Sequence, residues 1–326
     1  MTVLVTGGTG FVGRNLVERL LERPGERGRP VRCLARSPER AEDLSRLGAE
    51  IAPGDVASGA GLEEAVRGVR TVYHCAGVIR AWRREEYFET NAAGTGRLAA
   101  AARRAGVERF VLVSSLAASG PAVSGGEVTE ETEPRPMNAY GRSKLEGERA
   151  LAQAAGEMRH AILRPTIVYG PHDRDVLILF RAAARGFMPY VAPRGTLVSF
   201  IHVHDLVELM LIAGESAPPG RVYMASDGVP RSWEDAARAV ASAVGRRARA
   251  IRIPPACLAP AAACMEMFRW VLKRPPLLTL DKVREAAASW VASPERARVE
   301  LGWTPRIALD EGARMTAEWY RAQGWL

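Results

Sequence analysis

Short apolar runs rich in β-branched residues alternate with longer amphipathic stretches along the first half of the chain. The short runs predict strands at residues 3–6, 31–35, 71–75, 109–114 and 161–164. The longer stretches repeat apolar residues about every 3.6 positions and predict helices at residues 12–23, 38–47, 62–67, 85–105 and 140–155. Because strands alternate with helices, we predict an α/β fold with a doubly wound parallel sheet.

This alternation weakens after residue 170, where proline and glycine become frequent and helical stretches follow one another. Two late strands are still expected, near residues 197–202 and 221–224. The second part of the chain is therefore predicted to form a smaller, mostly helical lobe. Its boundary with the sheet is expected to be interleaved.

One stretch of this second part, residues 254–280, is strongly apolar. Pro260, Glu266 and Arg269 interrupt it, so it falls short of the roughly 20 apolar residues of a membrane-spanning helix. We predict a helix that covers an apolar cavity. Peripheral contact with a membrane surface is the alternative.

The composition is that of an ordinary globular protein. Of the 326 residues, 47% are hydrophobic and 25% are charged. The net charge of +8 is spread along the chain, and no nucleic-acid motif accompanies the basic clusters at residues 80–84 and 246–252. We therefore predict no nucleic-acid binding. A phosphorylated ligand is the simpler use of the positive charge.

The cysteines and histidines do not suggest a metal site. Cys33, Cys75, Cys257 and Cys264 form no C-x-x-C pair and do not combine with the five histidines at a metal-site spacing. The first strand runs directly into glycines, without the basic and apolar segments of a secretory signal. Reduced thiols, a cytoplasmic location and no bound metal are the expectation.

A glycine-rich turn joins the first predicted strand to the first helix, in the sequence Thr6-Gly7-Gly8-Thr9-Gly10-Phe11-Val12-Gly13. Gly7 permits a tight turn, Gly10 lets the backbone approach a pyrophosphate, and Gly13 allows close packing of helix on sheet. The helix N-terminus then faces the phosphate charge. This order of elements predicts a Rossmann-type dinucleotide site, with cofactor contacts from Thr6, Gly7, Gly10, Phe11, Val12 and Gly13.

The dinucleotide site gives the two parts of the chain their expected roles. We assign residues 1–170, with returning segments near 196–227, to a dinucleotide-binding Rossmann domain. Residues 171–195 and 228–326 are assigned to the substrate-binding lobe.

The end of the second predicted strand indicates which dinucleotide is bound. An acidic residue there accepts a hydrogen bond from the adenosine ribose, but the segment 32–38 contains none. Arg36 and Ser37 can instead hold a 2′-phosphate. We therefore favour NADP(H) over NAD(H).

Tyr140 and Lys144 stand one helical turn apart in the segment Ala139-Tyr140-Gly141-Arg142-Ser143-Lys144. The chain has only three lysines and seven tyrosines, which would form about 0.06 such pairs by chance. Residues four apart share a helix face, so the ammonium can favour the phenolate and lower the tyrosine pKa. Tyr140 is therefore a candidate acid or base.

The chain resembles the extended short-chain dehydrogenases/reductases, often described as NAD-dependent epimerases/dehydratases, over almost its whole length. The resemblance rests on the glycine turn and on an ordered series of further segments: 54–56, 73–77, 91–95, 113–115, 140–144, 164–171 and 201–205. Within the family, residues 164–168 look most like the 3β-hydroxysteroid dehydrogenase and dihydroflavonol reductase branch.

The resemblance implies roles for individual residues. The catalytic serine falls at Ser115, with Ser114 as a competing candidate. Asn91 and Asp205 match family positions, but a helix-anchoring amide and a helix N-cap are the alternatives. Further cofactor contacts are expected from Asp55 and Val56 near the adenine, from Cys75, Ala76 and Gly77, and from Pro165, Ile167 and Val168 past the nicotinamide. Tyr140 and Lys144 are expected to contact the cofactor as well.

The implied reaction is a reversible hydride transfer. In reduction, NADPH delivers hydride to a carbonyl carbon while Tyr140 protonates the oxygen and Ser115 holds it. Lys144 lowers the pKa of Tyr140 and binds the nicotinamide ribose. Oxidation reverses these steps.

Ile167 bears on the substrate, because nucleotide-sugar members usually place an asparagine at this position. We therefore predict a small-molecule substrate that is largely apolar and steroid-, isoprenoid- or flavonoid-like. A nucleotide-sugar epimerase or dehydratase is the first alternative, and a non-catalytic NADP(H)-binding sensor or assembly protein is the second. Either a monomer or a homodimer is compatible with the sequence.

Overall fold

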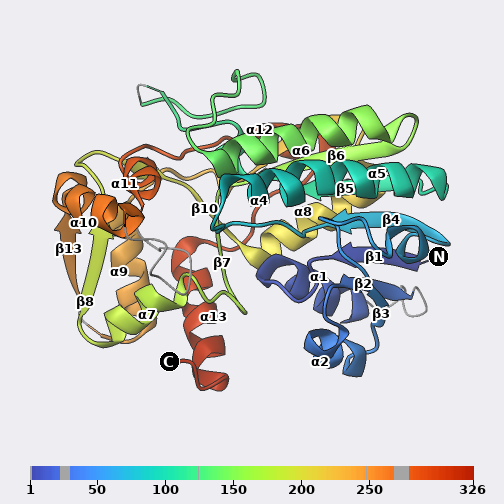
Figure 1. The fold of residues 1–326 in the computed structure, drawn as a ribbon. Helices are drawn as coiled ribbons and strands as arrows, with labels where there is room; N and C mark the ends of the chain where they lie inside the picture. Colours follow the sequence, from blue (N-terminus) through green and yellow to red (C-terminus); the bar gives the residue numbers. More distant parts are fainter. Residues whose placement is uncertain (1, 23–29, 124, 247, 268–278) are drawn as a thin grey trace.

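Seven parallel strands form the central sheet of the computed structural model, which describes residues 2–22, 30–123, 125–246, 248–267 and 279–326 (Figure 1). Their order across the sheet is β11-β6-β5-β4-β1-β2-β3, and each neighbouring pair is parallel. The predicted doubly wound α/β sheet is thereby confirmed. The strands are β1 (Thr2–Thr6), β2 (Val31–Ala35), β3 (Glu50–Pro53), β4 (Val69–His74), β5 (Arg109–Val113), β6 (Arg159–Pro165) and β11 (Arg221–Ala225).

Helices cover both faces of this sheet. One face packs against α1 (Phe11–Glu22), α2 (Glu42–Arg46) and α8 (Val203–Ser216), and the other against α3 (Leu62–Ala65), α5 (Thr95–Arg104) and α6 (Ala139–Ala155). Successive residues of a strand belong to opposite cores. In β1, Val3 and Val5 join the core with α1 and α8, whereas Leu4 joins the core with α5 and α6. Burial on both faces accounts for the unbroken apolar runs in the sequence.

Two predicted helices are interrupted in the structure. The stretch 38–47 starts as a 3₁₀ turn, η1 (Pro38–Ala41), before α2. The stretch 85–105 consists of α4 (Arg84–Phe88), a π-helical turn η2 (Glu89–Gly94) and α5. The wider turn brings the Asn91 carbonyl against Gly147 of α6, where a side chain would collide with it. Strand β3 escaped prediction from the apolar pattern because it is short and buries only Ala52.

The remaining elements form the C-terminal lobe and its junction with the sheet. Of the two predicted late strands, β11 joins the central sheet, whereas residues 197–202 form parts of separate two-stranded pairs, β9 with β12 and β10 with β7. The parallel pair of β8 with β13 was not predicted, so the lobe is not purely helical. The elements are β7 (Ile167–Tyr169), α7 (Leu177–Ala184), β8 (Phe187–Val191), β9 (Leu197–Val198), β10 (Phe200–His202), β12 (Arg231–Ser232), α9 (Trp233–Ala243), β13 (Arg249–Ile253), α10 (Pro255–Met267), α11 (Leu280–Ala286), α12 (Glu295–Leu301) and α13 (Leu309–Ala322).

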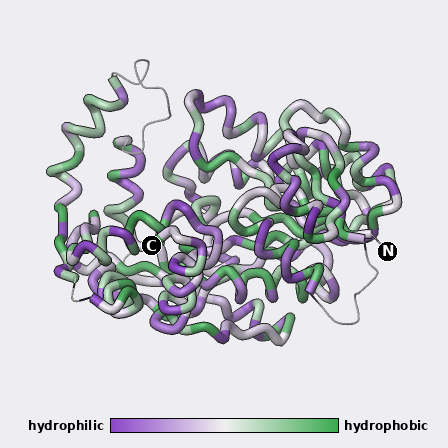
Figure 2. Tube along the Cα trace, turned by 90° about the horizontal axis from the view of Figure 1, so that it is seen from below, coloured by the Kyte–Doolittle hydropathy of each residue, from purple (hydrophilic) through white to green (hydrophobic). Residues whose placement is uncertain are grey.

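Helix α10 corresponds to the apolar segment singled out in the sequence, of which residues 268–278 lie outside the described residues. Figure 2 shows mainly hydrophobic residues along α10 at the edge of the lobe, yet only Ala262 among them is buried. Within the described part of the chain, no helix is both long enough and apolar enough to span a membrane.

Candidate active site

The glycine turn has the close backbone packing that a dinucleotide site requires. Gly7 adopts a φ of +71°, and a Cβ atom there would lie only 2.7 Å from the Ala76 nitrogen. Gly10 donates its backbone N–H to the Gly7 carbonyl at 2.9 Å. A Cβ atom on Gly13 would collide with that carbonyl. Gly7 and Gly13 therefore allow the turn to pack directly against neighbouring backbone, as the tight turn and close helix packing of a dinucleotide site require.

A cavity of about 270 Å³ opens beside this turn, at the carboxyl ends of β1, β2 and β4. Nine of the predicted cofactor residues line it: Thr6, Gly7, Gly10, Arg36, Asp55, Val56, Cys75, Ala76 and Gly77. Six further lining residues were not among the predicted contacts, namely Thr9, Leu34, Ala35, Gly54, Val78 and Thr90. The residues present thus fit an extended dinucleotide. The predicted contacts that do not line it are Phe11, Val12, Gly13, Ser37, Tyr140, Lys144, Pro165, Ile167 and Val168.

Position along the strands is the signal that would have found several of the missed residues. Leu34 and Ala35 end β2, the strand next to the glycine turn. Parallel strands end at a common edge, where ligands of such sheets bind. Thr90 had no such signal, because it lies in the π-helical turn η2.

Ser115 and Tyr140 meet at the end of β5. Ser115 begins the 3₁₀ turn η3 (Leu116–Ala118), and its hydroxyl lies close enough to Tyr140 to lower the pKa of the phenol. Gly141 makes this approach possible, since a Cβ atom there would collide with the Ala117 carbonyl. Ser114, the competing candidate, instead donates its hydroxyl to the buried Glu148 carboxylate. The structure therefore brings Ser115, and not Ser114, to Tyr140.

The first turn of α6 fixes the position of Tyr140. Asn138 caps the helix, with its side-chain oxygen accepting the Gly141 N–H at 2.8 Å. Burial raises the pKa of Tyr140 to about 12, and the nearby Ser115 hydroxyl opposes this rise. The phenol is therefore protonated at neutral pH and suited to donate a proton.

Lys144 lies deeper than the sequence suggested. Only 6% of its surface is exposed, and its Nζ donates a hydrogen bond to the Val113 carbonyl at 2.7 Å. Burial lowers the pKa of Lys144 to about 8, although the Glu148 carboxylate acts in the opposite direction. The predicted lowering of the Tyr140 pKa by Lys144 is not seen, because the ammonium is bound to the end of β5 and burial of the phenol dominates.

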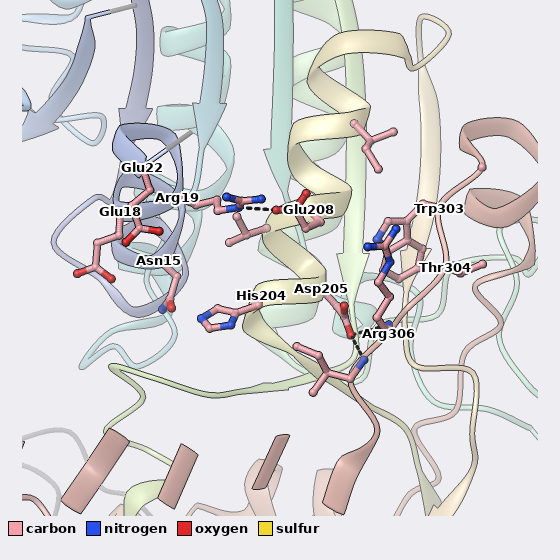
Figure 3. Close-up of a pocket in the computed structure, with 14 residues that line it drawn as sticks. Asn15, Glu18, Arg19, Glu22, His204, Asp205, Glu208, Trp303, Thr304 and Arg306 are labelled. Carbon is pink, nitrogen blue, oxygen red and sulfur yellow. Dashed lines mark hydrogen bonds and ion pairs between the residues drawn. The ribbon is translucent and has the colours of Figure 1, made fainter. Parts of the chain in front are cut away.

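Asn91 and Asp205 act as structural anchors. The Asn91 side chain donates to the Val78 carbonyl and the Ser143 hydroxyl, both at 3.0 Å, and accepts the Val78 N–H at 2.8 Å. His202, rather than Asp205, is the N-cap of α8. Asp205 accepts backbone N–H groups from residues 306 and 307 (Figure 3). The N-cap interpretation of Asp205 was therefore wrong, and its carboxylate ties α8 to the segment that leads into α13.

Figure 3 shows a larger cavity, of about 580 Å³, between α1, α8 and residues 302–307. Glu18, Arg19, His204 and Glu208 are among its lining residues, and Arg19 pairs with Glu208 at 2.6 Å. None of the predicted catalytic or cofactor residues lines it. This cavity therefore does not coincide with the predicted site.

Two further cavities take part of their lining from the C-terminal lobe. One, of about 470 Å³, is lined by Tyr140 together with residues of α4, α10 and α11. The other, of about 310 Å³, is almost wholly apolar and is lined by Ile167 and Tyr169 of β7 and by residues of α7, β8, α9 and α13. No described residue of α10 lines the apolar cavity, and residues 268–278 of the segment that was predicted to cover such a cavity lie outside the described residues.

Known proteins are similar to this chain in sequence and in fold. A model of the NAD dependent epimerase/dehydratase family matches residues 3–225. Ceramide reductase from Caulobacter vibrioides (strain NA1000 / CB15N) is 32% identical over 99% of this chain and 96% of its own length. For a 3-beta-hydroxysteroid dehydrogenase from Mycolicibacterium neoaurum the identity is 29%, over 98% and 90%.

Among solved structures, MoeE5 in complex with UDP-glucose and NAD matches with a TM-score of 0.78 and 28% identity over 99% of both chains. These matches confirm the resemblance drawn from the motifs. The chain therefore belongs to the NAD dependent epimerase/dehydratase family, within the extended short-chain dehydrogenases/reductases, and is a nicotinamide-dependent oxidoreductase.

Proposed function

We propose that the protein interconverts a carbonyl and a secondary alcohol on a largely apolar substrate, with Tyr140 as the acid or base. The proximity of Ser115 to Tyr140 carries this proposal, because it places two hydroxyls where both can contact one substrate oxygen. The chemistry that a bound nicotinamide supplies is hydride transfer to or from a carbon atom.

Residues of the chain have four further roles: proton transfer, binding of the substrate oxygen, charge stabilisation and binding of the dinucleotide. The Tyr140 hydroxyl donates a proton to the carbonyl oxygen in reduction and removes it in oxidation. The Ser115 hydroxyl donates a hydrogen bond to the same oxygen. Lys144, held by the Val113 carbonyl, puts a positive charge near the reacting groups when it is protonated. The glycine turn and the cavity around Arg36 and Asp55 hold the dinucleotide.

Two observations support an apolar substrate. The cavity of about 310 Å³ takes its lining mainly from hydrophobic side chains, and Ile167 belongs to it. A hydrocarbon buried there gains about 25 cal/mol per Å² of apolar surface removed from water. Ceramide reductase and the 3-beta-hydroxysteroid dehydrogenase are both similar to this chain over nearly its full length, and their names refer to lipids.

The test is a screen of NADPH oxidation and NADP⁺ reduction with ketosteroids, flavonoid-like ketones, aldehydes and nucleotide sugars. We expect turnover with apolar ketones or alcohols. Turnover confined to nucleotide sugars would replace the proposal with an epimerase or dehydratase, in line with the similarity to MoeE5. Tight cofactor binding without turnover of any compound would favour a sensor or assembly role.

We further propose that the cofactor is NADP(H), and that the Arg36 side chain binds its 2′-phosphate. Arg36 is exposed at the end of β2 and lines the dinucleotide cavity. Arg36→Ala is expected to weaken NADPH binding about tenfold or more, because it removes a charge-assisted hydrogen bond, and to leave NADH binding nearly unchanged. Titration of protein fluorescence with each nucleotide measures both affinities. Arg40→Ala, outside the lining, is the matched control, and tighter binding of NADH than of NADPH by the unaltered protein would refute the preference.

A further inference from the structure

The cavity that contains Tyr140 is lined by more cations than carboxylates. Among the described residues, six cationic side chains and two carboxylates, Glu266 and Asp281, line it. The cationic residues are Arg80, Arg83, Arg84, Arg142, Lys282 and Arg284. The Glu285 carboxylate also acts on this site, because it raises the pKa of Tyr140.

Four of these cations are paired with carboxylates. Arg80 lies 2.7 Å from Asp175, and Lys282 lies 2.7 Å from Glu285. The remaining two pairs are longer, Arg83 with Glu86 at 3.4 Å and Arg284 with Asp281 at 3.8 Å. Their charges are therefore largely offset within the protein.

Arg84 and Arg142 are different, because neither has a hydrogen-bonding or ionic partner for its side chain within the described part of the chain. Arg142 is half-buried and follows Tyr140 by two residues in α6, while Arg84 is exposed as the first residue of α4. The Tyr87 ring of α4 packs against the Tyr140 ring at 6.1 Å, so the two helices meet at the phenol. Both unpaired guanidinium groups thus line the cavity that the phenol lines.

The start of α6 adds to this positive potential. Asn138, Ala139 and Tyr140 of its first turn line the cavity, and the N-terminus of a helix carries a partial positive charge. A half-buried arginine without a partner loses hydration without gaining a hydrogen bond. An anion bound between Arg84 and Arg142 would supply the missing partner.

We propose that the substrate carries an anionic group, a phosphate or a carboxylate, which Arg142 and Arg84 bind beside Tyr140. This inference rests on the proposed oxidoreductase function. A guanidinium group matches either anion with two parallel hydrogen bonds. The hydrocarbon part of the same molecule belongs in the apolar cavity at Ile167. The substrate class is therefore an acidic amphiphile with a carbonyl or hydroxyl group.

Decyl phosphate and decanol, each below its micelle concentration, are suitable probes for binding to the full chain with NADP⁺ present. By isothermal titration calorimetry, the unaltered protein should bind decyl phosphate about 10- to 100-fold more tightly than decanol, the range expected from hydrogen bonds to a charged group. The double variant Arg84→Gln/Arg142→Gln should lose this preference. Arg83→Gln, which alters a paired arginine of the same cavity, should keep it.

Equal binding of the two probes by the unaltered protein, or an unchanged preference in the double variant, would overturn the inference. Vesicles of phosphatidylcholine with and without phosphatidylglycerol form the second arm. Loss of binding to the acidic vesicles in the double variant, with no preference for decyl phosphate in the unaltered protein, would identify the anion as a membrane surface and also overturn the inference.

Turnover of neutral ketones together with equal binding of both probes would leave the oxidoreductase function standing without the anionic group. A preference for decyl phosphate without turnover of any carbonyl would support the anion site and contradict the proposed oxidoreductase function.

Discussion

Replacement of Tyr140 by phenylalanine is expected to abolish measurable turnover while cofactor binding survives. The change removes one hydroxyl, the group that lies close to Ser115. General acid catalysis by a positioned side chain contributes roughly 10²- to 10⁴-fold to a rate, so kcat should fall by at least that range. Tyr140 does not line the cavity at the glycine turn, so the affinity for NADPH should stay within about twofold of its original value.

The measurement pairs steady-state kinetics with a nucleotide titration on the same preparation. Tyr87→Phe is the matched control, because Tyr87 lines the same cavity and packs on Tyr140 but has no role in the proposed proton transfer. It should retain most of the activity. Full turnover by the Tyr140 variant would remove this residue from the mechanism.

The raised pKa of Tyr140, about 12, also predicts a pH profile for carbonyl reduction. An acid must be protonated to work, so titration of Tyr140 should lower the rate only as the pH rises through this pKa, whereas loss of the Lys144 charge would act near pH 8. A decline centred near neutral pH would indicate that another group supplies the proton, or that a bound cofactor lowers the pKa.

The parts of the site that could be predicted from the sequence are those set by short segments. The glycine turn could be predicted because a strand, three glycines and a helix follow one another in order. Gly7 and Gly13 are required there because a Cβ atom at either position would collide with neighbouring backbone. Tyr140 and Lys144 lie on one helix, so their spacing was meaningful without knowledge of the fold. Ser115 is different, because its distance to Tyr140 depends on how β5 meets α6. The family resemblance, and not the local pattern, supplied it.

The choice between Ser114 and Ser115 illustrates the limit of a motif. Adjacent residues at a strand end point in opposite directions, so only one of the two can reach the phenol. The structure directs Ser114 to Glu148 and Ser115 to Tyr140. No local feature of the sequence separates the two serines.

Other features depend on contacts between distant segments. Arg84 and Arg142 are far apart in the chain and share a cavity only because α4 meets α6. The apolar cavity is enclosed by α7, α9 and α13 rather than by α10, although α10 has the apolar composition that suggested a cover. Composition predicts that a surface is hydrophobic but not which neighbour it has.

A buried ion pair gives the second large expected effect, on stability. Glu148 of α6 and Arg164 of β6 are 4% and 5% exposed. The Arg164 guanidinium donates to both carboxylate oxygens, at 3.0 Å and 2.6 Å, and to the Ser119 hydroxyl at 3.0 Å. Arg164→Met should lower the free energy of unfolding by about 3–5 kcal/mol, because it leaves the buried Glu148 carboxylate without the guanidinium that pairs with both of its oxygens.

Urea denaturation at neutral pH measures this loss, read from the shift of the midpoint at constant slope. Arg46→Met is a surface control, since Arg46 and Glu42 form an exposed pair, and it should change stability by no more than about 0.5 kcal/mol. The double variant Glu148→Leu/Arg164→Met is the decisive comparison. If the cost arises from an uncompensated charge, removing both partners should restore much of the stability that Arg164→Met alone loses.

A double variant as unstable as Arg164→Met alone would instead mean that the hydrogen bonds to Ser114 and Ser119, rather than charge balance, hold α6 against the sheet. That distinction bears on catalysis, because the same turn of α6 carries Lys144, and the Glu148 carboxylate raises the pKa of that lysine. Restored folding with a lower Lys144 pKa would separate the structural role of the ion pair from its electrostatic one.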